Sequence, residues 1–244
     1  MAFDTAGNIY VPHWYPRTPG GGPSNGTIAR FDANGNLLGP FERGSPFDGT
    51  TNCDPSSMAF DTAGTMYVGQ ADCTGHILKF DSAGNLVDSF AVLITNRGTD
   101  HIDLASDGCT IFYSSRDTNI YRYNVCTKTQ LSNFNTQPLP GYAAYHLRIL
   151  PDGGVLVADA AVIVRLDASG NQLQTYVAPG ETNNWGGLDL VGDGTFWATN
   201  AATDNVWRFD LTSGSPLDHF NTGTSGGHAA GVGVRGAPAQ SPPP

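Results

Sequence analysis

Five ionisable residues stand at corresponding places in three distant parts of the sequence and could carry chemistry together. His101 and Asp103 are separated by one residue, His146 and Arg148 repeat that spacing, and Asp189 follows further along the chain. Imidazole and carboxylate groups can hold a divalent metal ion or act as an acid–base pair. A guanidinium can hold an anion. The set suits a metal-assisted lyase or lactone hydrolase, with His101, His146 and Arg148 as candidate catalytic residues.

The candidate metal site has mixed ligands, with Ca²⁺ or Mg²⁺ as the candidate ion. Its ligands would be His101, Asp103, His146 and Asp189. They do not form the dense set of carboxylates that a lactonase site would want, and the sequence lacks a G-x-S-x-G elbow, a phosphate-binding glycine loop and an H-E-x-x-H motif. The alternative is a water-filled channel lined by polar side chains that pair with one another.

A repeated phrase explains how these distant residues could meet. "IARFDANGNLLGPF" from Ile28 and "ILKFDSAGNLVDSF" from Ile77 have relatives that start at Ile120, Ile163 and Val206. Alternating apolar residues around a D-x-x-G turn predict strand–turn–strand. An apolar alternation and a second short strand precede each phrase, so each unit has four strands. A repeat of roughly 42–45 residues with four strands predicts an all-β propeller of four-stranded antiparallel blades.

The count of repeats is uneven. Five units are complete, and a sixth inner-type strand, "AAGVGV", ends at Val234 with no further strands after it. This strand could close the ring within blade one, belong to a protein with more blades, or be exchanged between chains. We expect one propeller domain over residues 1–236 and a Pro-rich tail or linker over 237–244. The alternating residues of the inner strands would face a central channel, where the five ionisable residues would converge.

Two features of the repeat are interpreted as structural. The third strand carries a cation in every unit, which we expect to extend its aliphatic stem over the sheet and pair at the surface. The D-x-x-G turns faintly resemble calcium loops, but Asp and Gly are also the residues that tight hairpins use. The cations are Arg30, Lys79, Arg122, Arg165 and Arg208.

The four cysteines fall into two pairs in the blade scheme. Cys53 and Cys73 flank the first two strands of blade two on one rim, and Cys109 and Cys126 share the opposite rim of blade three. We predict disulfides Cys53–Cys73 and Cys109–Cys126, and therefore an extracellular, cell-surface or periplasmic location. Four free thiols in a cytosolic protein are the alternative.

Charge and hydropathy restrict the partners. The formal net charge is −10, which disfavours nucleic acid and anionic membranes. No segment reaches the roughly 18 apolar residues that a membrane span needs. The long connections fall on one rim and carry aromatic residues, so we predict a binding surface for a protein or a carbohydrate, or for self-assembly. Its expected anchors are Trp14, Tyr15, Tyr142 and Trp185.

The four-strand units with openings such as "AFDTAGNIYV" resemble the NHL, virginiamycin B lyase-like and gluconolactonase-like superfamily of β-propellers. The resemblance covers residues 1–236 and implies a ring of six or seven blades in most members, from which five clear repeats depart. It implies lyases, lactonases or pure binding proteins, the enzymes using the channel mouth and often a metal ion. We expect a secreted or cell-surface binding or assembly module without catalysis, with the channel enzyme as the alternative.

Overall fold

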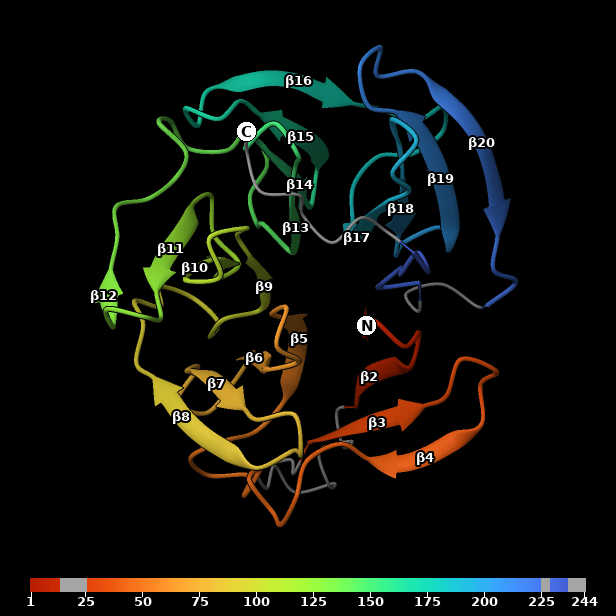
Figure 1. Cartoon of the computed structure of the whole chain (residues 1–244). Helices are drawn as coiled ribbons and strands as arrows, with labels where there is room; N and C mark the ends of the chain where they lie inside the picture. The colour runs from red at the N-terminus through yellow and green to blue at the C-terminus, as the bar shows by residue number, and fades with distance from the viewer. Residues whose placement is uncertain (14–25, 225–228, 237–244) are drawn as a thin grey trace.

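The chain folds into five four-stranded antiparallel sheets arranged around a central axis (Figure 1). The computed structural model describes residues 1–13, 26–224 and 229–236, which form twenty strands and no helix. In each sheet, strands that follow one another in the sequence are hydrogen-bonded neighbours. The predicted β-propeller with five complete blades is confirmed. We number the sheets blade 1 (β1–β4) to blade 5 (β17–β20).

The strands follow the sequence repeat, one repeat to a blade. In chain order they are β1 (Ala2–Phe3), β2 (Ile9–His13), β3 (Thr27–Phe31), β4 (Leu37–Pro40), β5 (Pro55–Phe60), β6 (Met66–Gln70), β7 (Ile77–Phe80), β8 (Leu86–Phe90), β9 (His101–Leu104), β10 (Thr110–Ser114), β11 (Ile120–Asn124), β12 (Thr129–Gln130), β13 (His146–Ile149), β14 (Val155–Asp159), β15 (Val162–Leu166), β16 (Gln172–Tyr176), β17 (Trp185–Leu190), β18 (Thr195–Asn200), β19 (Asn205–Asp210) and β20 (Pro216–Asn221).

Apolar clusters fill the four junctions between consecutive blades from blade 1 to blade 5. Strand β14 shows why the sequence demands this arrangement. Successive strand residues point to opposite faces of a sheet. Val155 and Val157 pack in the cluster between blades 3 and 4, while Leu156 and Ala158 pack in the cluster between blades 4 and 5. A strand that is apolar on both faces is stable only between two other sheets.

The D-x-x-G turns are closed by their own side chains. The Asp81 Oδ1 atom accepts hydrogen bonds from the backbone N–H groups of Ala83 and Asn85, and the Asn85 side chain donates to Oδ2. Gly84 adopts a φ of 86°, which favours glycine. The hydrogen bonds from Asn85 lower the pKa of Asp81. The turns at Asp4 and Asp32 repeat this pattern, so the carboxylates act as hairpin caps.

Both predicted disulfides are present. Cys53–Cys73 joins the loop before β5 to the loop after β6, with the two Cα atoms 5.8 Å apart. Cys109–Cys126 joins the β9–β10 turn to the turn after β11, with a Cα–Cα distance of 5.3 Å. No cysteine is free. Each bond therefore ties two connections of one blade at one of its ends.

The predicted sixth inner-type strand does not form a strand, and it does not close the ring within blade 1, whose inner strand is β1. Residues 229–236 lie between blades 5 and 1, close to the N-terminus (Figure 1). The Val234 N–H donates to Asp189 of blade 5 at 2.7 Å, and Arg235 donates to the Ala33 carbonyl of blade 1 at 3.2 Å. Residues 229–236 form no β-ladder with any described strand. The inner strands β5 and β9, in contrast, are each hydrogen-bonded to a second strand of their own blade.

Removing the Cys109–Cys126 disulfide should lower stability measurably. The bond closes a short loop, so replacing both cysteines, as Cys109→Ser with Cys126→Ser, should reduce the free energy of unfolding by about 3 kcal/mol. Urea unfolding of the double variant against the oxidised wild-type protein measures the effect. The wild-type protein in excess reductant is the control and should lose at least as much. An unchanged unfolding midpoint in the double variant would contradict the prediction.

Candidate binding face and central channel

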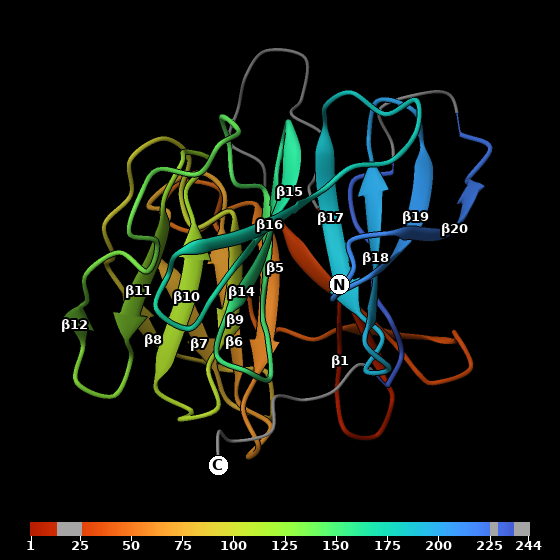
Figure 2. The ribbon, with the colours of Figure 1, turned by 90° about the horizontal axis from the view of Figure 1, so that it is seen from above.

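The strand connections gather at the two ends of the blades, which Figure 2 shows edge-on. Because every blade is a four-stranded meander, the links from the outermost strand of one blade to the innermost strand of the next all lie on one rim. These links are the long ones, and we call their rim the loop face. The described links are residues 41–54, 91–100, 131–145 and 177–184.

The five ionisable residues do converge at the central channel, where an arginine joins two carboxylates. Arg148 on β13 lies 3.6 Å from a carboxylate oxygen of Asp103 on β9 and 3.2 Å from one of Asp189 on β17. Burial raises the pKa of Asp103, against the opposing effect of Arg148, while the two carboxylates raise the pKa of Arg148 in spite of its burial. The guanidinium is thus used to balance two negative charges.

Both carboxylates also bind the backbone of the next inner segment. Asp103 Oδ2 accepts the Ile149 N–H at 2.9 Å, and Asp189 Oδ2 accepts the Val234 N–H at 2.7 Å. The Ser57 hydroxyl oxygen accepts the Ile102 N–H at 3.0 Å, as His101 Nδ1 accepts the Leu147 N–H one blade further on. Polar residues on the channel side of the inner strands therefore connect consecutive blades. Sequence reasoning missed this role, although the matching spacing of these residues was visible.

The two histidine rings pack against each other with their planes inclined by 36°. The rings of His101 and His146 have centroids 3.4 Å apart, and His101 Nδ1 accepts the Leu147 N–H at 3.4 Å. Burial lowers the pKa of both imidazoles well below the ordinary value, and nearby positive charge, Arg148 included, lowers it further. The pair is therefore neutral at pH 7. The buried Nδ1 atom of His146 has no hydrogen-bond partner.

The channel residues are arranged as a paired polar lining. Within the described residues, no group of three or more His, Cys, Asp or Glu side chains is placed to hold a metal ion. The four proposed ligands instead engage Arg148, backbone N–H groups and each other's rings. The metal-binding roles of His101, Asp103, His146 and Asp189 and the catalytic roles of His101, His146 and Arg148 stay predictions.

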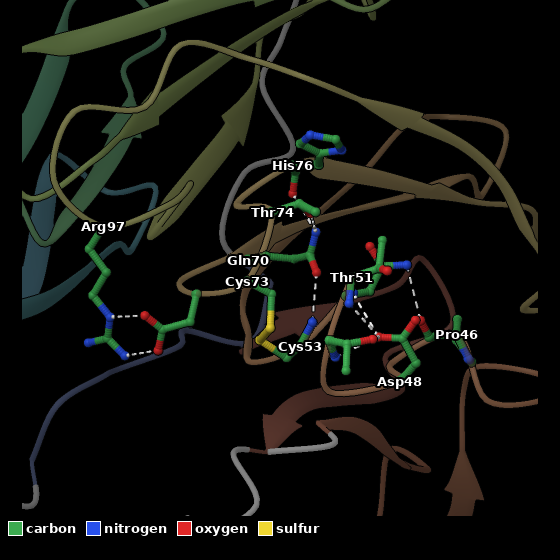
Figure 3. Close-up of a disulfide and its surroundings, with 12 residues drawn as sticks. Pro46, Asp48, Thr51, Cys53, Gln70, Cys73, Thr74, His76 and Arg97 are labelled. Carbon is green, nitrogen blue, oxygen red and sulfur yellow. Dashed lines mark hydrogen bonds and ion pairs between the residues drawn. A yellow bond between two sulfur atoms is a disulfide. The ribbon is translucent and has the colours of Figure 1, made fainter. Parts of the chain in front are cut away.

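The loop face is held in a fixed conformation around the Cys53–Cys73 disulfide (Figure 3). The Gln70 side chain accepts the Cys53 N–H at 2.9 Å and donates to the His76 carbonyl at 3.0 Å. The Asp48 carboxylate accepts the N–H groups of residues 50, 51 and 52, which lower its pKa to about 2. A disulfide and hydrogen bonds thus fix two neighbouring loops.

Ion pairs extend this network to blade 3. Arg97 binds Asp72 through two nitrogen atoms, at 3.3 and 2.9 Å, as Figure 3 also shows. Arg116 donates to Asp100 at 2.5 Å and stacks over the Tyr145 ring at 4.8 Å. Bidentate pairing fixes both side chains in one geometry. The loops of blades 2 and 3 are therefore cross-linked along the rim.

Tyr142 is the one described anchor that the structure presents to solvent, with 54% of its surface exposed. The buried Asp159 carboxylate holds the loop below it: Oδ2 accepts the Gly141 N–H at 2.5 Å. Burial raises the pKa of Asp159 to about 6. Asp159 is therefore a positioning residue for Tyr142. Sequence reasoning missed it, because nothing in its surroundings in the sequence distinguishes it from other strand-end aspartates.

The prediction for Trp185 is wrong. Its side chain is only 2% exposed and packs between blades 4 and 5, with its ring centroid 5.9 Å from that of Phe209. The large apolar ring is buried because Trp185 starts β17 and its side chain points into the blade junction. Trp14 and Tyr15 lie outside the described residues. Their predicted role as anchors stays a prediction.

Comparison with known proteins supports the fold. No family model and no curated protein matches the sequence. Among solved structures, the chain is similar to one titled "Crystal structure of Nidogen/Laminin Complex", with a TM-score of 0.67 and 14% identity over 90% of this chain and 78% of that chain. It is also similar to the WD40 β-propeller domain of Doa1, with a TM-score of 0.58 and 15% identity over 84% and 66% of the two chains.

These likenesses define the class of protein as a β-propeller. At such identities they establish the fold alone, and the narrower superfamily named above is not established by them. The described residues contain no helix long and apolar enough to span a membrane.

Acid should destabilise the protein through the paired buried histidines His101 and His146. Their folded-state pKa values lie below the unfolded value of about 6.5, so the unfolded state takes up protons first and stability falls as pH drops below about 6.5. Between pH 7 and pH 5 we expect a loss of roughly 1–2 kcal/mol per histidine. Urea unfolding at several pH values measures it.

The control is the double variant His101→Gln with His146→Gln. Asp159 acts in the opposite direction, since its raised pKa makes its contribution to stability grow as pH falls from about 6 towards 3.8. Asp159 is present in both proteins, so the difference between them isolates the histidines. Equal pH dependence in the wild-type protein and the double variant would contradict the prediction.

Proposed function

We propose that this chain is a secreted or cell-surface β-propeller that binds a protein or carbohydrate, or assembles with other copies, through its loop face. The observation that carries the proposal is the fixed conformation of that face. A disulfide, the buried Gln70 side chain and the Arg97–Asp72 and Arg116–Asp100 pairs hold its loops. A surface that is ordered before binding loses less conformational entropy when a partner docks.

Tyr142 is the proposed anchor within this face. Aromatic side chains contribute large contact areas at low entropic cost, and tyrosine is enriched among the residues that dominate binding energy. Asp159 fixes the backbone next to it. The proposed location rests on the two disulfides, which persist in oxidising compartments. A solved structure of similar fold is, by its title, a complex of nidogen with laminin, which favours a protein partner.

The alternative is the enzyme that the superfamily resemblance implies. It would be a lyase or lactone hydrolase centred on the channel, with one imidazole moving a proton and Arg148 holding an anion. One observation favours it: the buried His146 Nδ1 atom has no hydrogen-bond partner and belongs to a neutral ring that could accept a proton. The pairing of Arg148 with two carboxylates supports a structural role instead. We therefore favour binding.

The test is binding to an array of secreted proteins and glycans by the oxidised protein. A Tyr142→Ala variant should weaken binding to any captured array partner by about tenfold or more, because the exposed ring is the anchor. Leu173→Ala is the matched control: Leu173 is 58% exposed on β16, away from the loop face. It should leave binding unchanged. Equal effects of the two variants would contradict the loop-face proposal.

The enzyme alternative is tested separately with His146→Ala. Calorimetric titration of the wild-type protein with Ca²⁺ and with Mg²⁺, together with a screen of lactone and lyase substrates, should show neither metal binding nor turnover if the chain is a binding module. Turnover that His146→Ala abolishes while the thermal unfolding midpoint stays near the wild-type value would overturn the proposal in favour of the enzyme.

A further inference from the structure

The face of blade 5 that points away from blade 4 carries the same residue pattern as four surfaces that are buried elsewhere in the ring. Cross-strand pairing places Thr199, Val206 and Phe220 side by side on this face, and Trp197 lies two residues from Thr199 on the same strand. The equivalent residues of blade 4, Ala158, Ile163, Tyr176 and Leu156, are all buried against blade 5. We call the residues Trp197, Thr199, Val206 and Phe220 the open face of blade 5. Thr199 and Val206 are already covered, at 1% and 5% exposed, whereas Trp197 is partly exposed and Phe220 is 52% exposed.

The aromatic residue that ends each repeat phrase shows the difference most clearly. It is 6% exposed or less in blades 1 to 4, where the following blade covers it. In blade 5 the equivalent residue, Phe220, is 52% exposed. The four buried equivalents are Phe41, Phe90, Phe134 and Tyr176. One position of the repeat therefore keeps its apolar side chain without the cover that all other copies have.

Blade 1 has a matching uncovered face on the other side of the same junction. In blade 2, the residues that pack towards the preceding blade, Met66, Val68, Leu78 and Phe80, are fully buried. The strand pairing makes Ile9, Val11, Ala29 and Phe31 their equivalents in blade 1, and all four of these are partly exposed. Two apolar sheet faces thus border the same junction, and neither is fully covered.

Residues 229–236 fill only the inner part of this junction. The segment packs so closely on blade 5 that a side chain at Gly187 would lie 2.7 Å from the Gly231 Cα atom. Val234 binds Asp189 as Ile149 binds Asp103, so the segment stands where the inner strand of a further blade would stand. A cavity of about 360 Å³, lined by Val206, Phe220, Val232 and Met1 among others, lies beside it.

We propose that this junction binds a three-stranded antiparallel β-meander of a partner polypeptide, which completes a sixth blade around residues 229–236. The meander would need apolar residues on both faces, to pack on blade 5 and on blade 1, and its first strand would pair with the segment that already holds the inner position. Within the described residues, all five three-stranded sets are used in their own blades. A folded second copy therefore offers no free set from these residues.

The first test uses a meander of known sequence as the probe. Residues 151–187 of this chain contain β14, β15 and β16 and the loop that follows, and they can be fused to a soluble carrier protein. The oxidised protein should bind this probe with one-to-one stoichiometry in calorimetry. Phe220→Lys should weaken binding by about tenfold or more, since it places a charge at the centre of the docking face. Leu217→Lys is the matched control, because Leu217 is on the same strand and 53% exposed.

A joined chain removes the dependence on affinity. Residues 151–187 can be fused directly ahead of Met1. Met1 is the repeat equivalent of Leu188, so the meander then precedes blade 1 as it precedes blade 5 in the natural order. In this joined chain, Phe220→Lys should lower the thermal unfolding midpoint well below that of its parent. In the unjoined protein, Phe220→Lys should change the thermal unfolding midpoint little. Leu217→Lys should shift the midpoint by the same amount in the joined and the unjoined chain.

Three results would overturn the proposal. One is an equal effect of Phe220→Lys in the joined and unjoined chains. Another is a joined meander that proteases remove while the five blades stay intact. The last is concentration-dependent self-association of the unmodified protein, measured by light scattering and abolished by Phe220→Lys, which would assign the open face to a second copy. The binding measured with the Tyr142→Ala variant tests only the loop-face proposal. The loop-face proposal and the sixth-blade proposal can therefore fail independently.

Discussion

Every blade in this protein has two apolar faces, and both must be covered by something. This requirement follows from strands such as β14, in which neighbouring residues are all apolar and point alternately to the two sides. A single sheet with this pattern would leave both faces in water, and two sheets would leave two outer faces exposed. Only a ring satisfies the requirement for every blade, because each blade then lies between two others. The four apolar clusters are the direct consequence.

The ring geometry also explains the polar channel. The inner strands converge, and polar side chains that point to the axis accept backbone N–H groups of the next blade. Asp103, Asp189 and Ser57 accept such N–H groups. Two buried carboxylates so close together require a cation, and Arg148 supplies it. The residues that look most like catalytic groups are thus also the ones that the blade junctions need.

The loop face and the open junction depend on the ring in different ways. The loops have the freedom to vary because the blades beneath them are rigid, and their disulfide and ion pairs then restrict that freedom to one conformation. Within the described residues, the junction between blades 5 and 1 is the one place where the two apolar sheet faces are only partly covered. Phe220 is the aromatic residue that is buried at this position in the other four blades, but here it is half exposed. Exposed apolar surface of this kind is typical of binding sites.

Local sequence determined the blades, and the reason is that their information is local. The D-x-x-G turns and the alternation around them need only neighbouring residues, so five repeats, their strand order and both disulfide pairs could be predicted. The convergence of His101, Asp103, His146, Arg148 and Asp189 followed from the same periodicity.

Which contacts those residues make there was decided by tertiary structure. Whether Asp103 reaches Arg148 and the Ile149 N–H depends on distances between blades, which no local pattern contains. Trp185 was assigned to the surface because it lies beside a loop, yet a one-residue difference in register turns a side chain from solvent into a junction. The state of the sixth inner segment likewise depended on whether a second strand lies beside it, since a β-strand exists only through its hydrogen-bonded neighbour.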